Sequence, residues 1–172
     1  THYGFRLSGD TIGQTFTTIE PFGFESVDFY LQRATGTGFI KALLYSTSGG
    51  LPDVLLATSN TSYNYTQLSN VDVVWYNFEF DTYSLDASTQ YAVALTVYSD
   101  ASTDIECWGA TSDVYAGGNT VVQSTGWQTA AYDLAVKIYG STRFKNLYLA
   151  EHINLGSATV TDHEEGRISY DE

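Results

Sequence analysis

Four aromatic side chains are the residues of this sequence best suited to bind a ligand: Trp75, Trp108, Trp127 and Tyr115. Each combines a flat apolar ring with a polar group at its edge, which is the combination that stacks on the pyranose ring of a sugar. Trp75 points outward in the alternation of its segment, and Trp127 follows a turn at Ser124-Thr125-Gly126. The sequence therefore predicts a glycan-binding surface. Two alternatives remain open, because such residues also pack over loops and fill contacts between chains.

Acidic residues that could catalyse a reaction occur at Asp104-Ile105-Glu106. The triplet resembles the Glu-x-Asp-x-Glu strand of jelly-roll glycanases, in which two glutamates on one strand face act as nucleophile and acid/base. Ser102 stands where the first glutamate would be, so a retaining mechanism lacks its nucleophile, and an edge strand with outward acids is the alternative. The sequence also contains no serine-hydrolase elbow, no His-Glu-x-x-His pair and no phosphate-binding glycine loop. We expect no catalytic residues and no enzymatic activity.

A structural calcium ion is the one cofactor that the acidic residues suggest. Asp100, Asp104, Asp113 and Asp133 lie in or beside expected loops, and calcium prefers several oxygen ligands. Their spacing matches no defined calcium-binding loop, so a solvated acidic rim is the alternative interpretation. A chelator that leaves the melting temperature unchanged would remove the calcium hypothesis.

Length and charge limit the remaining classes of protein. The chain has 172 residues, which corresponds to one domain at the usual ~100–200 residues per domain. Its formal charge is -13 at pH 7, from 20 acidic and 7 basic residues, and this charge repels the phosphate backbone of nucleic acids. No apolar run reaches the ~18 residues that a membrane-spanning helix requires. We expect neither a nucleic-acid partner nor insertion into a membrane.

Two sequence features bear on the compartment. Cys107 is the only cysteine, so an intrachain disulfide is excluded, and we expect it to be a small buried apolar residue. Asn60-Thr61-Ser62 and Asn64-Tyr65-Thr66 match the acceptor pattern for N-glycosylation and are predicted to lie in a surface loop. These triplets favour an extracellular location.

Strict alternation of apolar and polar residues recurs along the chain, as in half-buried strands. The first inward row is Val27, Phe29 and Leu31, and the second is Ile40, Ala42 and Leu44. Ser46–Pro52 is rich in turn residues and is predicted to be a loop. Further inward rows are Val74, Tyr76, Phe78 and Phe80; Tyr91, Val93, Leu95 and Val97; and Leu134, Val136 and Ile138. About eight such segments with almost no helical pattern predict two packed antiparallel sheets.

The pattern changes after Gly140. Residues 1–140 are predicted to form the β-sandwich, and residues 141–172 a C-terminal extension that serves as a linker or an oligomer contact. The extension is too short to bury a core of its own, so we expect it to lie along the sandwich or to pair with a neighbouring chain.

An ordered set of segments resembles a jelly-roll β-sandwich module over about residues 12–140. The set comprises Gly13 to Thr17, Phe39 to Tyr45, Gly50-Leu51-Pro52, Leu56 to Ser59, Trp75 to Phe80, Gln90 to Leu95, Tyr115 to Gly118 and Asp133 to Gly140. Similar modules occur in structural proteins of tailed phages and archaeal viruses and in secreted or surface proteins of bacteria, where they decorate, adhere or bind glycans without catalysis. Leu155 to Tyr170 is similar to the short β repeats that join domains in viral fibres. The resemblance implies an all-β, antiparallel, two-sheet jelly-roll sandwich with a short β-containing C-terminal extension.

The resemblance also implies a function. Our leading hypothesis is a non-enzymatic structural or adhesion module of a virion or cell surface, such as a viral tail, fibre or decoration protein. It would assemble with copies of itself or with neighbouring virion or surface proteins, and it would bind a host or environmental glycan. The alternatives are a carbohydrate-binding module of a secreted polysaccharide-degrading enzyme and an exported adhesive filament subunit completed by strand addition. Each hypothesis places the protein on a virion or outside the cell.

Overall fold

β-Strands dominate the computed structural model, which describes residues 2–8, 11–98, 104–110, 112, 115–140 and 147–148. The strands within these residues are β1 (His2–Ser8), β2 (Thr11–Thr17), β3 (Phe22–Thr35), β4 (Phe39–Ser48), β5 (Leu51–Asn64), β6 (Val74–Leu85), β7 (Gln90–Tyr98), β8 (Asp104–Ala110), β9 (Thr120–Gln123), β10 (Trp127–Ala130), β11 (Asp133–Leu134), β12 (Val136–Gly140) and β13 (Leu147–Tyr148). The helical structure among the described residues is a single 3-10 turn, η1 (Tyr65–Gln67). The near absence of helix follows from the period-2 patterning of the sequence.

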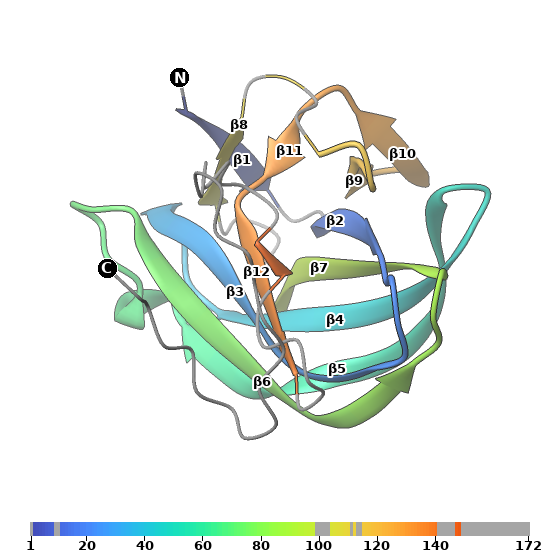
Figure 1. Ribbon diagram of the computed structural model, residues 1–172. Coiled ribbons are helices and arrows are strands. Elements are labelled where there is room, and N and C mark those ends of the chain that lie inside the picture. Colours follow the sequence, from blue (N-terminus) through green and yellow to red (C-terminus); the bar gives the residue numbers. More distant parts are fainter. Residues whose placement is uncertain are drawn as a thin grey trace, which may run out of the picture.

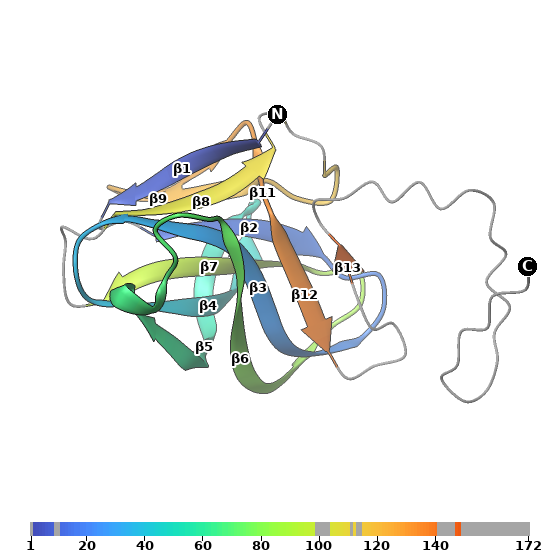
Figure 2. The same ribbon diagram turned by 90° about the vertical axis from the view of Figure 1, so that its left-hand side faces the viewer.

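Two antiparallel sheets pack against each other. One contains the row β1-β8-β3 with β6 on the other side of β3; β12 also pairs with β3 and continues to β13, and β11 pairs with β8. The second sheet has the order β10-β9-β2-β7-β4-β5. Figure 1 and Figure 2 show β12 running alongside β3 in both views.

The first eight strands have the connectivity of a jelly roll. They form the rows β1-β8-β3-β6 and β2-β7-β4-β5, so that consecutive strands change sheets, except for the hairpin of β4 and β5. This is the double Greek-key arrangement of jelly-roll sandwiches. The predicted fold class is therefore confirmed, and β9 to β13 are additions to it.

The core lies between the inner faces of the two sheets. The predicted row Val27, Phe29 and Leu31 is buried, with at most 1% of each side chain exposed. Other predicted inward residues that are fully buried are Ile40, Ala42, Leu44, Phe78, Val93, Leu95, Leu134, Val136 and Ile138. Three predicted inward residues are less buried: Tyr76 and Val97 are partly buried and packed against the core, and Val74, at the start of β6, is 40% exposed.

Cys107 is buried in this core, as expected. Burial removes water from the thiol and raises its pKa to about 12.

The predicted loop Ser46–Pro52 is mostly strand. β4 continues to Ser48 and β5 begins at Leu51, so the connection is the pair Gly49 and Gly50, with φ of 60° and 83°. Two consecutive residues with positive φ form the tight hairpin turn that matches strand twist, and glycine adopts it without steric cost. The turn was correctly located, but its length was overestimated.

Two other local predictions were wrong. The Asn60 and Asn64 triplets do not form a surface loop: Asn60 is exposed within β5, and Asn64 is the last residue of β5 and caps η1. β8, which carries Glu106, is not an edge strand, because it pairs with β1 on one side and with β3 on the other.

Most of the predicted extension, residues 141–172, lies outside the described residues. Its described part is β13, whose Leu147 and Tyr148 pair with Ile138 and Lys137 of β12. This pairing gives the extension a β-strand against the sandwich. The roles as linker or oligomer contact stay predictions.

Candidate functional site

The outward face of the seven-stranded sheet gathers polar and aromatic side chains from three neighbouring strands. The strand register places Asn77 of β6, Asp28 of β3 and Lys137 of β12 in one row across the sheet. Tyr30 of β3 and Trp75 of β6 are paired in the next row. Because their neighbours Val27, Phe29 and Phe78 point into the core, these side chains point outward.

The carboxylate of Asp28 is held in place by two hydrogen bonds. The Nδ2 group of Asn77 donates to Asp28 Oδ1 at 2.6 Å, and the hydroxyl of Tyr139 donates to Asp28 Oδ2 at 2.9 Å. The backbone of Asn77 is also held, because the hydroxyl of Tyr63 donates to its backbone carbonyl oxygen at 2.9 Å. Asn77 and Tyr139, both half-buried, thus hold the Asp28 carboxylate in a fixed position.

Negative charge surrounds this polar row. The pKa of the Tyr63 phenol is raised, mainly by burial and further by the nearby carboxylates of Asp28 and Glu79. Tyr63 therefore remains neutral at physiological pH and keeps its proton for the bond to Asn77.

An aromatic pair lies beside the polar row. The rings of Tyr30 and Trp75 are 4.9 Å apart between centroids and inclined by 32°. The ammonium group of Lys137 lies 4.0 Å from the centroid of the Trp75 ring, within the range of a cation–π interaction. Trp75 is thus directed outward, as predicted, and is held by contacts with β3 and β12.

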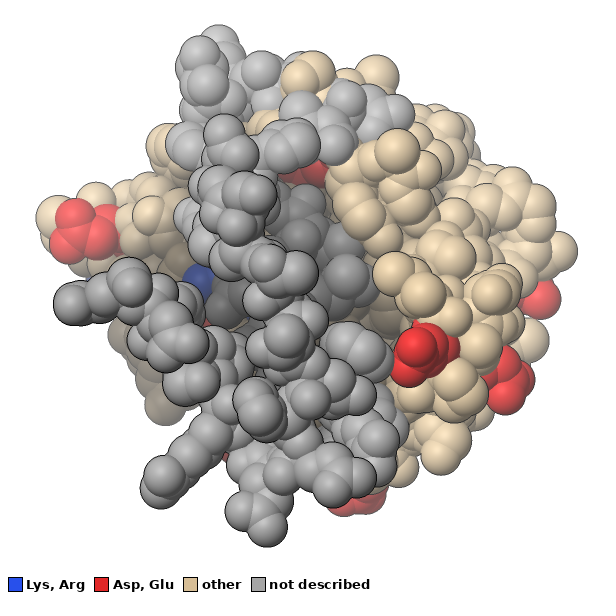
Figure 3. All heavy atoms as spheres, in the orientation of Figure 1, with Lys and Arg blue, Asp and Glu red and all other residues tan. Residues whose placement is uncertain are grey.

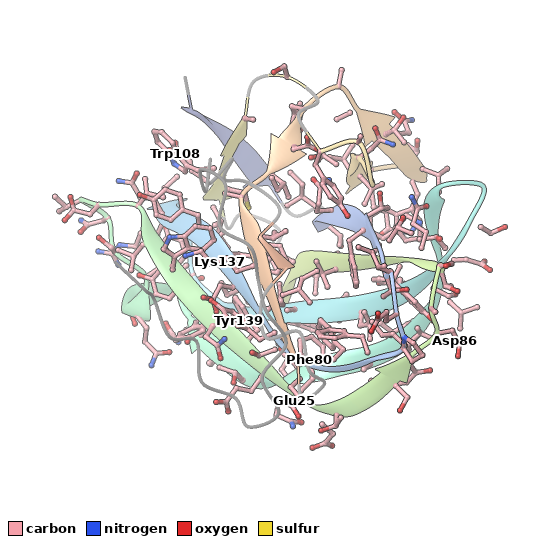
Figure 4. All side chains as sticks on the ribbon, viewed as in Figure 1. Glu25, Phe80, Asp86, Trp108, Lys137 and Tyr139 are labelled. Atoms are coloured by element: carbon pink, nitrogen blue, oxygen red, sulfur yellow. The ribbon has the colours of Figure 1, made fainter. Side chains whose placement is uncertain are left out.

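Trp108 is a third aromatic residue of the same sheet face. It follows the buried Cys107 on β8 and so points outward, and its side chain is half-buried. Its indole Nε1 is buried with no hydrogen-bond partner among the described residues. Figure 4 shows Trp108, Lys137 and Tyr139 following one another down one side of the molecule.

We call these seven residues the aromatic face: Asp28, Tyr30, Trp75, Asn77, Trp108, Lys137 and Tyr139. The other two aromatic residues predicted to bind glycan, Trp127 and Tyr115, lie elsewhere.

Trp127 belongs to the opposite sheet. Its ring meets that of Tyr45 edge to face, with centroids 5.6 Å apart. In a flat six-stranded sheet the edge strands β10 and β5 would be about 24 Å apart, but here they are in contact, so the sheet is strongly curled. The contact between Trp127 of β10 and Tyr45 of β4 therefore joins two strands that the curling of the sheet brings together.

Tyr115 packs against the edge of the core. Its hydroxyl accepts a 3.5 Å hydrogen bond from the backbone N–H of Thr17, and burial raises the pKa of its phenol. Neither Tyr115 nor Trp127 adds a contact to the aromatic face.

Sequence reasoning missed five members of the aromatic face: Asp28, Tyr30, Asn77, Lys137 and Tyr139. Alternation identifies all of them as outward residues, but it does not reveal which strands are neighbours. The pairing of β12 with β3, more than a hundred positions away in the chain, brings Lys137 and Tyr139 to Asp28.

The proposed calcium ligands are not brought together in the part of the chain that the structure describes. Asp133 is buried, and its carboxylate accepts hydrogen bonds from Gln14 Nε2 at 2.8 Å and from the backbone N–H of Tyr115 at 2.7 Å. It is therefore not part of a solvated rim. Asp100 and Asp113 lie outside the described residues, and of Asp104 only the backbone is described. Among the described residues no three His, Cys, Asp or Glu side chains cluster as a metal site would require.

Comparison with known proteins gives no further constraint: no family model, curated protein or solved structure matches this chain. The described residues also contain no helix of the length and hydrophobicity needed to cross a membrane. The fold itself defines the class, an antiparallel jelly-roll β-sandwich.

Proposed function

We propose that this protein is a non-enzymatic module of a virion or cell surface that binds a glycan through the aromatic face. The observation that carries the proposal is the placement of Trp75 and Tyr30, 4.9 Å apart, beside an Asp28 carboxylate fixed by Asn77 and Tyr139. Binding sites commonly combine apolar or aromatic surface with a few positioned polar groups.

The aromatic and polar side chains of this face match the apolar and polar groups of a sugar. The C–H groups of a pyranose ring pack on an indole or phenol ring, while its hydroxyls both donate and accept hydrogen bonds. Asp28 offers carboxylate lone pairs as acceptors, and Lys137, whose ammonium lies over the Trp75 ring in the absence of ligand, offers a donor when a sugar takes its place on the ring. Because neighbouring contacts already hold these side chains, binding would cost little additional side-chain entropy.

The assignment as a non-enzyme rests on the sequence. Ser102 replaces the first acid of the glycanase-like strand, and the motifs of hydrolases and nucleotide-binding proteins are lacking. We therefore propose recognition without turnover.

Loss of glycan binding in Trp75→Ala is the test of this proposal. The purified chain is screened against immobilised glycans and soluble polysaccharides, and the ligands that bind are titrated against the variant. We expect affinity to fall about tenfold or more, because central aromatic residues dominate binding energy. Trp127→Ala is the matched control, since it removes the same ring from the opposite sheet and should leave affinity unchanged. Equal effects of the two variants, or no binding by the original chain, would contradict the proposal.

Assembly is a second proposal, carried by a separate observation. Phe39 and Tyr98 are paired across β4 and β7 and are 47% and 45% exposed, so two large exposed aromatic side chains lie next to each other on this sheet. We propose that this surface contacts another copy of the chain. Mass measured by light scattering should exceed that of a monomer and fall in the Phe39→Ser, Tyr98→Ser double variant. The control is Val71→Ser, which alters an exposed apolar residue elsewhere, and a strictly monomeric wild type would contradict the proposal.

The surrounding genes distinguish the two biological settings. Neighbouring virion genes would support a tail, fibre or decoration component. A catalytic domain encoded in the same reading frame would instead support a carbohydrate-binding module of a secreted enzyme.

A further inference from the structure

We infer that the ligand of the aromatic face is an extended, uncharged glycan that crosses strands β6, β3 and β8, with one sugar over Trp75 and Tyr30 and another over Trp108. The inference rests on the proposed glycan binding and adds the length, direction and charge of the ligand. It makes Trp108 a second binding position, separate from the first.

The backbone between Tyr30 and Trp108 sets the separation of the two positions. The N–H of Tyr30 donates to the carbonyl of Ala135, and the N–H of Ala135 donates to the carbonyl of Trp108 at 2.9 Å. Ala135 therefore lies between the two aromatic residues, where β3 and β8 diverge from their direct pair Leu31 and Cys107. The backbones of Tyr30 and Trp108 are at most about two strand spacings, or ~10 Å, apart. Trp75 lies on the other side of Tyr30, so the three residues form a row across the strands.

This separation corresponds to two sugar units of an extended glycan. In a β-1,4-linked chain each unit is turned over relative to the one before, so that every second unit presents the same ring face to a flat surface. A chain lying across the strands would displace the Lys137 ammonium from the Trp75 ring and stack one sugar unit on the Trp75 and Tyr30 pair. It would then pass over the small Ala135 side chain and stack a second unit, two positions further along the glycan, on Trp108. The site therefore requires at least three consecutive sugars for full affinity.

The charge of the protein favours an uncharged chain. Glu79 lies on an outward position of β6, opposite Ser26 and so near Asp28, and Glu106 lies on an outward position of β8 in the same sheet. Acidic side chains are spread over the described surface, whereas basic ones are scarcely visible in Figure 3. With a net charge of -13, the protein repels polyanions such as carboxylated or sulfated glycans.

The experiment measures affinity against ligand length. Cello-, xylo- and manno-oligosaccharides from di- to hexasaccharide are titrated by calorimetry, with carboxymethyl-cellulose as the charged probe. For the series that binds, we expect affinity to rise from disaccharide to tetrasaccharide and to be weak for the charged polymer. Trp108→Ala should remove this rise, lowering hexasaccharide affinity about fivefold or more while leaving disaccharide affinity unchanged. Trp75→Ala should weaken binding at every length.

Controls separate this inference from the function on which it rests. Trp108→Phe keeps an aromatic ring and should retain the length dependence, and thermal unfolding of each variant verifies that it is folded. If glycans bind but Trp108→Ala follows the wild-type length dependence, or if the charged polymer binds more tightly, the inference is wrong and glycan binding stands. If the wild type binds no glycan at all, the proposed function fails together with the inference.

Discussion

At the scale of single residues, a network of buried polar side chains stabilises the fold. Gln14 and Asp133 are both completely or almost completely buried, and they link β2 to β11 through their side chains. Gln14 Oε1 also accepts hydrogen bonds from the hydroxyl of Thr120 and the N–H of Leu134. Such a network is stabilising only while every member keeps its partners.

Asp133→Ala tests this network. The change leaves the amide of Gln14 and the N–H of Tyr115 without their acceptor in a buried region, so we expect the free energy of unfolding to fall by about 2–4 kcal/mol. Urea denaturation monitored by tryptophan fluorescence measures the loss. Asp81→Ala is the control: its carboxylate accepts one exposed hydrogen bond from Asn60, so its removal should change stability by less than about 0.5 kcal/mol. Similar losses in the two variants would contradict the assignment.

At the scale of elements, the segment between Tyr115 and Asn119 is tied to strand β2. The backbone N–H of Thr15 donates to the carbonyl of Asn119 at 2.9 Å, and the N–H of Asn119 donates to the hydroxyl of Thr15 at 2.7 Å. Thr17 adds a hydrogen bond from its hydroxyl to the carbonyl of Gly117. The segment thereby fixes the start of β9 against the sheet.

Gly118→Ala should break this attachment. A methyl group at this position would collide with the backbone carbonyl of Thr15, which cannot move without disturbing β2, so we expect a loss of about 2 kcal/mol or more. Gly126→Ala is the matched control, since a methyl group there meets open space and should change stability by less than about 1 kcal/mol. Thermal unfolding of both variants gives the comparison, and an unaffected Gly118→Ala would show that the segment is not held tightly.

The elements also show what could be predicted from sequence and what could not. Alternation correctly identified the inward residues of β3, β4 and most of β6, because a half-buried strand requires it. It identified Trp75 as outward for the same reason. The neighbours of Trp75 were not predicted, because pairing between distant strands depends on the whole topology and leaves no local signal. The loop predicted over Ser46–Pro52 was too long. The polar residues that flank Gly49 and Gly50 are as common in loops as at the ends of strands, so their types did not show where the strands end.

At the scale of the whole molecule, the buried thiol of Cys107 and several partly buried tyrosines determine how stability changes at high pH. The pKa of Cys107 is raised from 9.0 to about 12 by burial, and burial also raises the pKa of Tyr45, Tyr63, Tyr115 and Tyr132. These groups contribute full stability below the pKa values of the unfolded chain. Above them the unfolded chain loses protons that the folded protein retains, so stability decreases with pH.

We therefore expect the melting temperature to be constant up to about pH 9 and to fall as the pH rises from there toward 12. Calorimetry under reducing conditions measures this dependence. In Cys107→Ala the decrease should begin closer to pH 10, where only the tyrosines contribute. A melting temperature that stays constant through pH 11 would contradict the assignment of these groups as buried and neutral.

The jelly-roll connectivity has a consequence for synthesis of the chain. β1 pairs only with β8 among the described strands, β2 pairs with β7, and β3 completes its hydrogen bonding with β12. The first three strands are therefore synthesised long before the strands that complete their pairing. Their apolar side chains stay exposed to solvent until those strands have been made. Folding dominated by such distant pairs is slow, on the order of milliseconds to seconds. Fragments that end before Val136 would lack β12, and we expect them to aggregate during expression.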